Sequence, residues 1–333
     1  LKYVWLSDTA PIKQAREAAK FDTVHELHAH LDEVQAQIER DLSHPDDKER
    51  MIATACFLID ALCLRVGDEK DPGEADTVGA TTLRPEHVTV HPDGSAEFRF
   101  LGKDSVLWHK TLELPEQVQA NLNELLSNAR PSASSANSDK SHPTRDRPQL
   151  FPDISSRDVN AYLSGILPVL TAKVFRTHHA TMAVRDSLEG SGIQASDPTY
   201  LKWETANLAN LEAAILCNHT KMAPASWPRS RKRYKERQEK AVERVRGYQQ
   251  RLKTQREALT ALRKEALEKR RAAPSGRKKQ VKARYQKRIG VAERRVERTR
   301  GMLERARRSR DKIKAQYSIA SKKRTWNLGT SLK

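Results

Sequence analysis

The fold class of this chain is decided by residues 87–114, which read HVTVHPDGSAEFRFLGKDSVLWHKTLEL. Apolar and polar residues alternate in three runs, and the short turn-forming segments PDG and GKDS separate these runs. Alternation with a period of two is typical of strands with one buried face, and tight turns of this kind join antiparallel neighbours. The stretch therefore predicts a three-stranded antiparallel β-meander, with Lys103 and Asp104 at the exposed tip of its second turn.

Helices are predicted on both sides of the meander. Residues 46–67 repeat apolar residues at helical spacing, and the helix is expected to end at Gly67 with Arg65 in its last turn. Further helices are expected within residues 1–45 and at about 155–189 and 203–221. The Ser- and Pro-rich segment at about 128–148 has no periodicity and predicts a flexible surface loop. The expected core domain, residues 1–226, is thus mainly α with a small β-meander, an α+β fold.

Residues 227–318 differ from the rest of the chain in pattern. Apolar residues recur at heptad spacing in two arms, for example Val245, Leu252 and Leu259 in the first and Val296 and Leu303 in the second. The segment AAPSGRKK interrupts the repeat between the arms. Two helices joined by such a turn predict a protruding antiparallel coiled-coil hairpin. Residues 319–333 would then begin a separate C-terminal segment.

The positive charge is concentrated in this predicted hairpin. The formal net charge is +18, but residues 229–324 contain 37 Lys and Arg against 10 Asp and Glu, and the remainder carries −9. A basic segment of this kind indicates a polyanionic partner, although a solvated charged helix is the other interpretation. The acidic remainder is not expected to grip DNA without help.

Several classes of protein are excluded by missing patterns. The three cysteines have no metal-ligand spacing and indicate a reducing, intracellular compartment. No apolar run reaches the roughly 18 residues of a membrane helix. The sequence contains no G-x-x-x-x-G-K phosphate loop, no G-x-S-x-G elbow and no zinc spacing. We therefore expect no membrane association, no phosphate-binding loop and no zinc site.

Four cationic groups at the ends of predicted elements could act on a phosphodiester: Arg65, Lys103, Arg176 and His219. Two guanidiniums can hold the non-bridging oxygens and neutralise charge in a phosphoryl-transfer transition state. A lysine on a turn could protonate the leaving oxygen, and a histidine could donate to another oxygen. Each group also has a structural explanation: a cation at a helix C-terminus, a solvated turn residue, an ion-pair partner and a satisfied helix histidine, respectively.

Five longer strings resemble one enzyme family. They occur in order as LCLRVGDEKDPGEADTVGATTLRPEHV (62–88), FRFLGKDSVLWHK (98–110), TAKVFRTHHATMA (171–183), AAILCNHTKMAP (213–224) and LGTSLK (328–333). Together they closely resemble the type IB DNA topoisomerases of eukaryotes and some archaea, and the resemblance covers nearly the whole chain. It implies the tyrosine recombinase/topoisomerase IB catalytic fold.

The resemblance also implies an activity and a set of site residues. The family relaxes supercoiled double-stranded DNA through a transient 3′-phosphotyrosine, and it needs neither ATP nor a divalent metal. Arg65 and Arg176 match its catalytic arginines, Lys103 its general acid, and His219 its phosphate-contacting histidine. Further matched positions that could contact DNA are Lys70, Asp104, Lys173, Thr177 and Asn218. Asp68, His178 and His179 depart from the residues that the family usually has.

The resemblance places the nucleophile outside the sequence. In the family, the motif LGTS leads within about six residues to the nucleophilic tyrosine, which would lie two residues beyond Lys333. We therefore expect this chain to bind DNA without cleaving it alone. The tyrosine would follow in a longer monomer or belong to a separate small subunit. The protein would be intracellular and DNA-associated, in the nucleus of a eukaryote or the cytoplasm and nucleoid of an archaeon.

Two alternatives stay open from the sequence. A tyrosine site-specific recombinase shares the catalytic fold, but such enzymes usually have a histidine where Lys173 stands and a short interval after His219. The other alternative is a non-catalytic nucleic-acid-binding protein whose basic coiled coil makes the contacts.

Overall fold

The computed structural model describes Ser7 and residues 9–67, 77–129 and 148–328. The chain divides into two compact units. The first unit comprises residues 1–192, 209–221 and 326–333, and the second unit comprises residues 193–208 and 222–325. The loop predicted at about 128–148 lies almost entirely outside the described residues.

A three-stranded antiparallel sheet lies in the first unit, as the alternating pattern predicts. Its strands, in spatial order, are β1 (Val88–Val90), β2 (Ser95–Gly102) and β3 (Val106–Glu113). Phe98 pairs with Val88 on one side and with Lys110 on the other, which fixes the register of the sheet. Phe98, Phe100 and Trp108 are buried at alternating positions, so one face of the sheet packs on the core.

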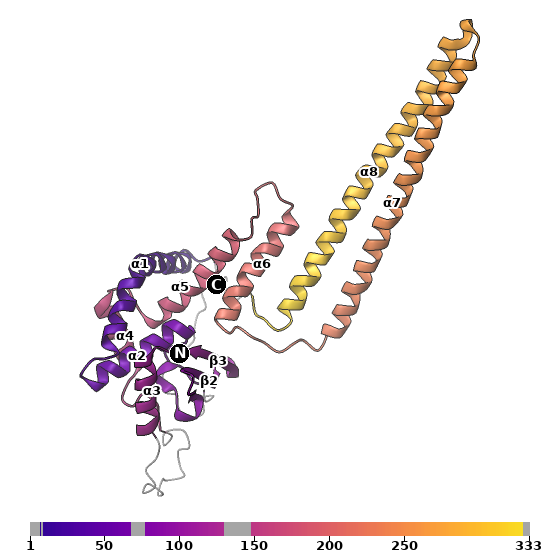
Figure 1. Ribbon diagram of the computed structural model, residues 1–333. Coiled ribbons are helices and arrows are strands. Elements are labelled where there is room, and N and C mark those ends of the chain that lie inside the picture. The colour runs from indigo at the N-terminus through magenta and orange to yellow at the C-terminus, as the bar shows by residue number, and fades with distance from the viewer. Residues whose placement is uncertain (1–6, 8, 68–76, 130–147, 329–333) are drawn as a thin grey trace. The chain divides into compact units, whose positions relative to one another are not determined.

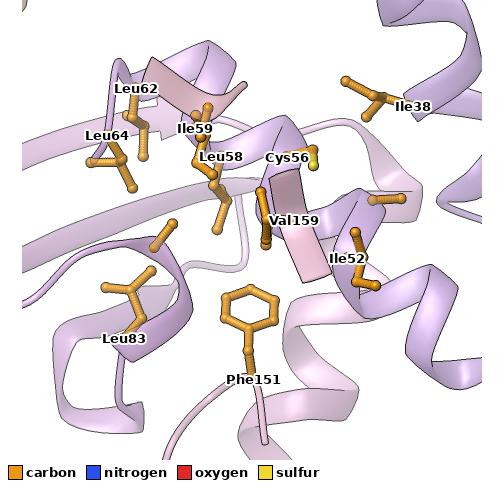
Figure 2. Close-up of a cluster of buried hydrophobic side chains, with 14 of the residues drawn as sticks. Ile38, Ile52, Cys56, Leu58, Ile59, Leu62, Leu64, Leu83, Phe151 and Val159 are labelled. Carbon is orange, nitrogen blue, oxygen red and sulfur yellow. The ribbon is translucent and has the colours of Figure 1, made fainter. Parts of the chain in front are cut away.

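Helices form the rest of the first unit. They are α1 (Pro11–Asp41), α2 (Asp47–Leu62), α3 (Glu116–Asn128), α4 (Ser156–Ile166), α5 (Ala172–Glu189) and the C-terminal part of α6 (Thr199–Leu216). The Asp46 carboxylate caps α2 by accepting from the backbone N–H groups of Lys48 and Glu49. Figure 2 shows the core around α2, where the Phe151 ring lies below Leu58 and Val159. These three side chains are fully buried, so α2 is the central element of this unit.

Helix α2 ends at Leu62, five residues before the predicted end at Gly67. Cys63 adopts a left-handed conformation with φ 54°, and the backbone N–H of Leu64 bonds back to the Ile59 carbonyl. This arrangement satisfies terminal carbonyl groups and stops the helix. Arg65 therefore follows the helix in a non-helical segment, and its predicted place in the last helical turn is wrong.

The second unit is dominated by a hairpin of two long helices, α7 (Trp227–Ala272) and α8 (Lys278–Lys323) (Figure 1). A short 3₁₀ turn at Ser275–Arg277 connects them. Val245, Leu252, Leu303 and Ala306 form a buried seam between the helices. Each helix has 46 residues and is therefore about 70 Å long.

Polar contacts along the hairpin show that its helices run antiparallel. Arg263 donates to Glu293 at 2.7 Å, and the Tyr285 hydroxyl donates to Glu265 at 2.6 Å. The predicted fold class is confirmed: a mainly helical chain with a small antiparallel meander and a long helical hairpin. Across the part of the chain that is described, no helix has the length and apolar character needed to cross a membrane.

Candidate active site

Arg176 lies on α5 and joins the carbonyl ends of two other helices. Its Nη1 donates to the Cys63 carbonyl at 2.9 Å, and its Nη2 donates to the Cys217 carbonyl at 2.6 Å. Cys63 caps α2 and Cys217 directly follows α6, so both acceptors belong to helix ends, where the dipole favours a cation. Burial lowers the pKa of Arg176, and the neighbouring charge of Arg65 lowers it further.

His219 is held against Arg176 by the way α6 ends. Asn218 turns the chain with a left-handed φ of 52°, and the His219 backbone N–H bonds to the Ala214 carbonyl at 2.8 Å. The His219 Nε2 then lies 3.1 Å from Nη2 of Arg176. Because a guanidinium only donates, Nε2 accepts this bond and the ring proton resides on Nδ1.

The environment keeps the His219 ring neutral. Burial is the main cause that lowers its pKa, to about 4, and the charges of Arg176 and Arg65 act in the same direction. At pH 7 the ring is therefore a neutral acceptor toward Arg176. With three N–H groups of Arg176 donated to described partners, two remain for a ligand.

Arg65 is positioned by a crossing of two glycines. The Arg65 carbonyl accepts from the Ala80 N–H at 2.8 Å, which pairs the segment after α2 with the segment before the sheet. A Cβ atom on Gly79 would lie 2.5 Å from the Cα of Gly67, and Gly67 has a φ of +90°. Only glycines allow this approach, so the crossing sets the position of the Arg65 backbone. The Arg65 side chain is exposed beside the cavity described below.

Lys103 occupies the turn between β2 and β3, as the sequence predicts. The turn is a single 3₁₀ turn, Lys103–Ser105, and Ser105 has a left-handed φ of 55°. The Lys103 side chain is exposed and borders the same cavity as Arg65. Because the Lys103 side chain is already exposed, it can reach a ligand in the cavity without first being released from a buried position.

These residues surround one cavity of about 650 Å³ in the first unit. Seven of the nine residues predicted for the site line it: Arg65, Lys103, Lys173, Arg176, Thr177, Asn218 and His219. Lys20 adds a further cation, and no carboxylate is present among the described side chains of the lining. The cavity therefore has the electrostatic character of an anion site.

Two predicted residues cannot be placed in the cavity. Lys70 lies outside the described residues, and the side chain of Asp104 is not among those described. Asp68, which departs from the usual family residue, also lies outside the described residues. Within the described portion of the chain, no group of three or more His, Cys, Asp or Glu side chains is arranged to hold a metal ion.

Lys110 is a functional candidate that the sequence reasoning missed. It lies on β3, the strand that follows the Lys103 turn. Its Nζ donates to the Leu216 carbonyl at 3.0 Å and lies 4.8 Å from the Trp108 ring centre. Burial lowers the pKa of Lys110. The signal that could have revealed it is its place in the alternating pattern, since it shares the core-facing side of β3 with Trp108.

The segment near the last described residues runs beside His219. Asn327 donates its backbone N–H to the His219 carbonyl at 2.8 Å, and Trp326 forms an antiparallel bridge with Thr220. Leu328 is buried in a cluster that includes Leu211. The start of the C-terminal motif is therefore attached next to the cavity.

Comparisons with known proteins identify the family to which this chain is similar. The model of the family "Eukaryotic DNA topoisomerase I, catalytic core" matches residues 9–255. The mitochondrial DNA topoisomerase I of Homo sapiens is 34% identical over 236 residues, which cover 69% of this chain and 37% of that protein. DNA topoisomerase 1 of Candida albicans is 36% identical over 222 residues, which cover 66% of this chain and 26% of that protein. The chain thus spans about a third of the length of these curated relatives.

The family match includes every residue of the cavity from Lys20 to Thr220 and the first helix of the hairpin up to residue 255. It covers well over half of the chain. The chain therefore belongs to the eukaryotic DNA topoisomerase I family.

Proposed function

We propose that this chain supplies the phosphate-binding part of a type IB DNA topoisomerase, which relaxes supercoiled double-stranded DNA by transient cleavage of one strand. The observation that carries the proposal is the convergence of Arg65, Lys103, Arg176 and His219 on one cavity without a described carboxylate. A phosphodiester is an anion that such a set can hold bidentately.

In the proposed reaction a tyrosine gives its phenolic proton to solvent and its oxygen attacks the phosphorus, which breaks the bond to the 5′ oxygen of the DNA. Arg65 and Arg176 stabilise the negative charge on the non-bridging oxygens, and Lys103 gives its proton to the leaving oxygen. Rotation of the free end relaxes the duplex, and attack by the 5′ hydroxyl on the phosphotyrosine reseals it. Four cationic or donating side chains account for the charge and the proton, so we propose that neither ATP nor a divalent metal is required.

His219 adds a hydrogen-bond group whose role depends on the ligand. In this structure its Nε2 accepts from Arg176. A phosphate that binds between the two residues would compete for the Arg176 N–H groups and would favour a proton on His219, because an anion raises the pKa of a neighbouring histidine. We propose that His219 then donates to a non-bridging oxygen.

We propose that the nucleophilic tyrosine comes from outside these 333 residues. In the first unit the Tyr162 hydroxyl donates to Asp41 at 2.6 Å, and no described tyrosine lines the cavity. In the second unit Tyr285 bonds to Glu265, and Tyr234 packs on Tyr317 within the hairpin. The attachment of Asn327 beside His219 supports a nucleophile that follows this segment, whether in the same chain or on a second subunit.

The hairpin is proposed to contact the DNA backbone. Its cations outnumber its acids by 37 to 10 between residues 229 and 324, and most of these side chains are exposed. Such a surface binds phosphates with little dependence on sequence. The protein would accordingly be DNA-associated.

The test is relaxation of supercoiled plasmid by the complete protein in EDTA without ATP. Arg65→Ala and Arg176→Ala should abolish cleavage while DNA binding is largely kept, and Arg157→Ala, at an exposed position on α4, should leave both unchanged. If binding and cleavage fall in parallel, the transition-state role is wrong. If Arg176→Ala relaxes DNA normally, the protein is a binding protein and the catalytic proposal fails.

The role of Lys103 has its own test. Lys103→Ala should slow cleavage of ordinary DNA by about 10²- to 10⁴-fold, the usual range for a general acid. A substrate with a 5′-thiolate leaving group needs no proton and should restore the rate. Failure of that restoration would remove the general-acid assignment.

A further inference from the structure

Two reciprocal hydrogen bonds tie β3 to the end of α6. Lys110 on β3 donates its Nζ to the Leu216 carbonyl at 3.0 Å, and Asn218 donates its Nδ2 to the Leu107 carbonyl at 2.8 Å. One side chain therefore reaches from the strand to the helix end, and the other reaches back. We refer to this pair of contacts, made by Lys110 and Asn218, as the β3–α6 clamp.

On the helix side, the clamp binds a helix end that other bonds also hold. Leu216 is the last residue of α6, so its carbonyl lacks a partner within the helix and attracts a cation. Arg176 binds the next carbonyl along the chain, that of Cys217, so two cations bind neighbouring carbonyls at this helix end. Asn218 is fixed in its left-handed conformation by its backbone bond to Ile215.

The strand side of the clamp is equally constrained. β3 is an edge strand of the described sheet, so backbone groups on its outer side have no neighbouring strand to bind. The Leu107 carbonyl accepts from Asn218 instead. The Lys110 ammonium lies over the Trp108 ring, which is buried and stacks with Phe100 at 6.2 Å between ring centres. The contact with the buried Trp108 ring therefore helps to place the Lys110 ammonium at the Leu216 carbonyl.

The clamp joins the two segments that carry separate parts of the proposed site. Lys103 is four residues before Leu107 in the same hairpin, and His219 directly follows Asn218. The clamp therefore links the β-hairpin that carries Lys103 directly to the segment that carries His219. Misplacement of a reacting group by about 1 Å can reduce a rate by about 10²-fold.

We propose that Lys110 and Asn218 are positioning residues that hold Lys103 in register with Arg176 and His219 through the β3–α6 clamp. The proposal rests on the proposed function, because it concerns the delivery of the Lys103 proton. It also changes the expected role of Asn218, whose amide is used within the protein rather than on DNA.

The experiment compares single-turnover cleavage of ordinary DNA and of the 5′-thiolate substrate by the complete protein. Lys110→Met removes the donor but keeps an unbranched stem, and Asn218→Gly removes the amide while allowing the positive φ. Each variant should cleave ordinary DNA about 10- to 100-fold more slowly, cleave the thiolate substrate within about threefold of the unmodified protein, and keep its affinity for DNA. Lys110→Arg should retain most of the ordinary rate because the donor persists.

The matched control is His109→Gln. His109 lies on the same strand but is exposed and bonds to Glu97, so its replacement should leave both rates unchanged. Equal slowing of both substrates by the clamp variants would indicate a general structural defect and would overturn the proposal, as would unchanged rates. A loss of DNA affinity confined to Asn218→Gly would return that residue to a DNA contact and also overturn it.

These outcomes differ from failure of the proposed function. If the thiolate substrate does not rescue Lys103→Ala, the general-acid assignment itself fails, whatever the clamp variants do. If it rescues Lys103→Ala but not Lys110→Met or Asn218→Gly, only the clamp proposal fails.

Discussion

Acidification should weaken the contact between α1 and α5 through His178, and replacing His178 by glutamine should remove most of this effect. His178 is 3% exposed, and its Nε2 lies 3.1 Å from Nδ1 of His28 on α1. Its Nδ1 has no hydrogen-bond partner among the described residues. A proton added to this ring would create a poorly solvated charge next to two other imidazoles, those of His28 and His179.

The size of the effect follows from the shifted pKa of His178. The pKa is lowered to about 4, mainly by burial and also by the neighbours His179, His28 and Arg185, while Asp60 opposes them. The unfolded chain has the ordinary value of about 6.5, so it binds the proton first as the pH falls. The stabilisation is therefore complete above pH 6.5 and is lost progressively down to pH 4, with about 2 kcal/mol lost between pH 7.5 and pH 5.

The assay is urea unfolding of the 333-residue chain, followed by tryptophan fluorescence at both pH values. His178→Gln should lose about 2 kcal/mol less than the unmodified chain on acidification. His25→Gln, at an exposed position of α1, is the matched control and should show the full dependence. The reasoning is refuted if His178→Gln and the unmodified chain lose the same unfolding free energy.

Two further predictions concern the glycine crossing and the hairpin. Gly79→Ala should lower the unfolding free energy by about 1–3 kcal/mol, because its Cβ would overlap the backbone of Gly67. Gly165→Ala on α4 is the control: its Cβ meets nothing within 4 Å, and it should raise the unfolding free energy by about 1 kcal/mol. Equal melting temperatures for the two variants would contradict the crossing. Deleting residues 235–315 removes 30 basic and 10 acidic residues. Chemistry should survive in the complete protein while the slope of log affinity against log salt becomes shallower, and an unchanged slope would mean that the hairpin does not touch DNA.

The meander and the hairpin could be predicted from the sequence because each depends on a local period. Alternation over residues 95–113 fixes which side chains of β2 and β3 are buried, and heptad spacing pairs α7 with α8. The end of α2 could not be predicted in this way. A cysteine in the left-handed conformation has no local signal, and Cys63 adopts it where its carbonyl meets Arg176 from a distant helix.

The sequence predicted most of the residues that line the cavity, but it did not predict the contacts among residues far apart in the chain. Residue chemistry alone offers two arginines, a lysine and a histidine in almost any basic protein, and the ordered motifs were needed to select Arg65, Lys103, Arg176 and His219. Contacts between residues far apart in sequence stayed hidden. The His28–His178 pair and the bond from Lys110 to the end of α6 are examples, because neither has a periodic pattern.

The glycine crossing ties the placement of Arg65 to the backbone and not to the arginine side chain. Bonds from Ala80 and Thr81 to the carbonyls of Arg65 and Val66 close the chain at that point, and Gly67 and Gly79 touch through backbone atoms. Because these contacts involve only backbone atoms, replacing the Arg65 side chain leaves them in place. A loss of activity in Arg65→Ala would consequently report on the guanidinium itself and not on a displaced wall of the cavity.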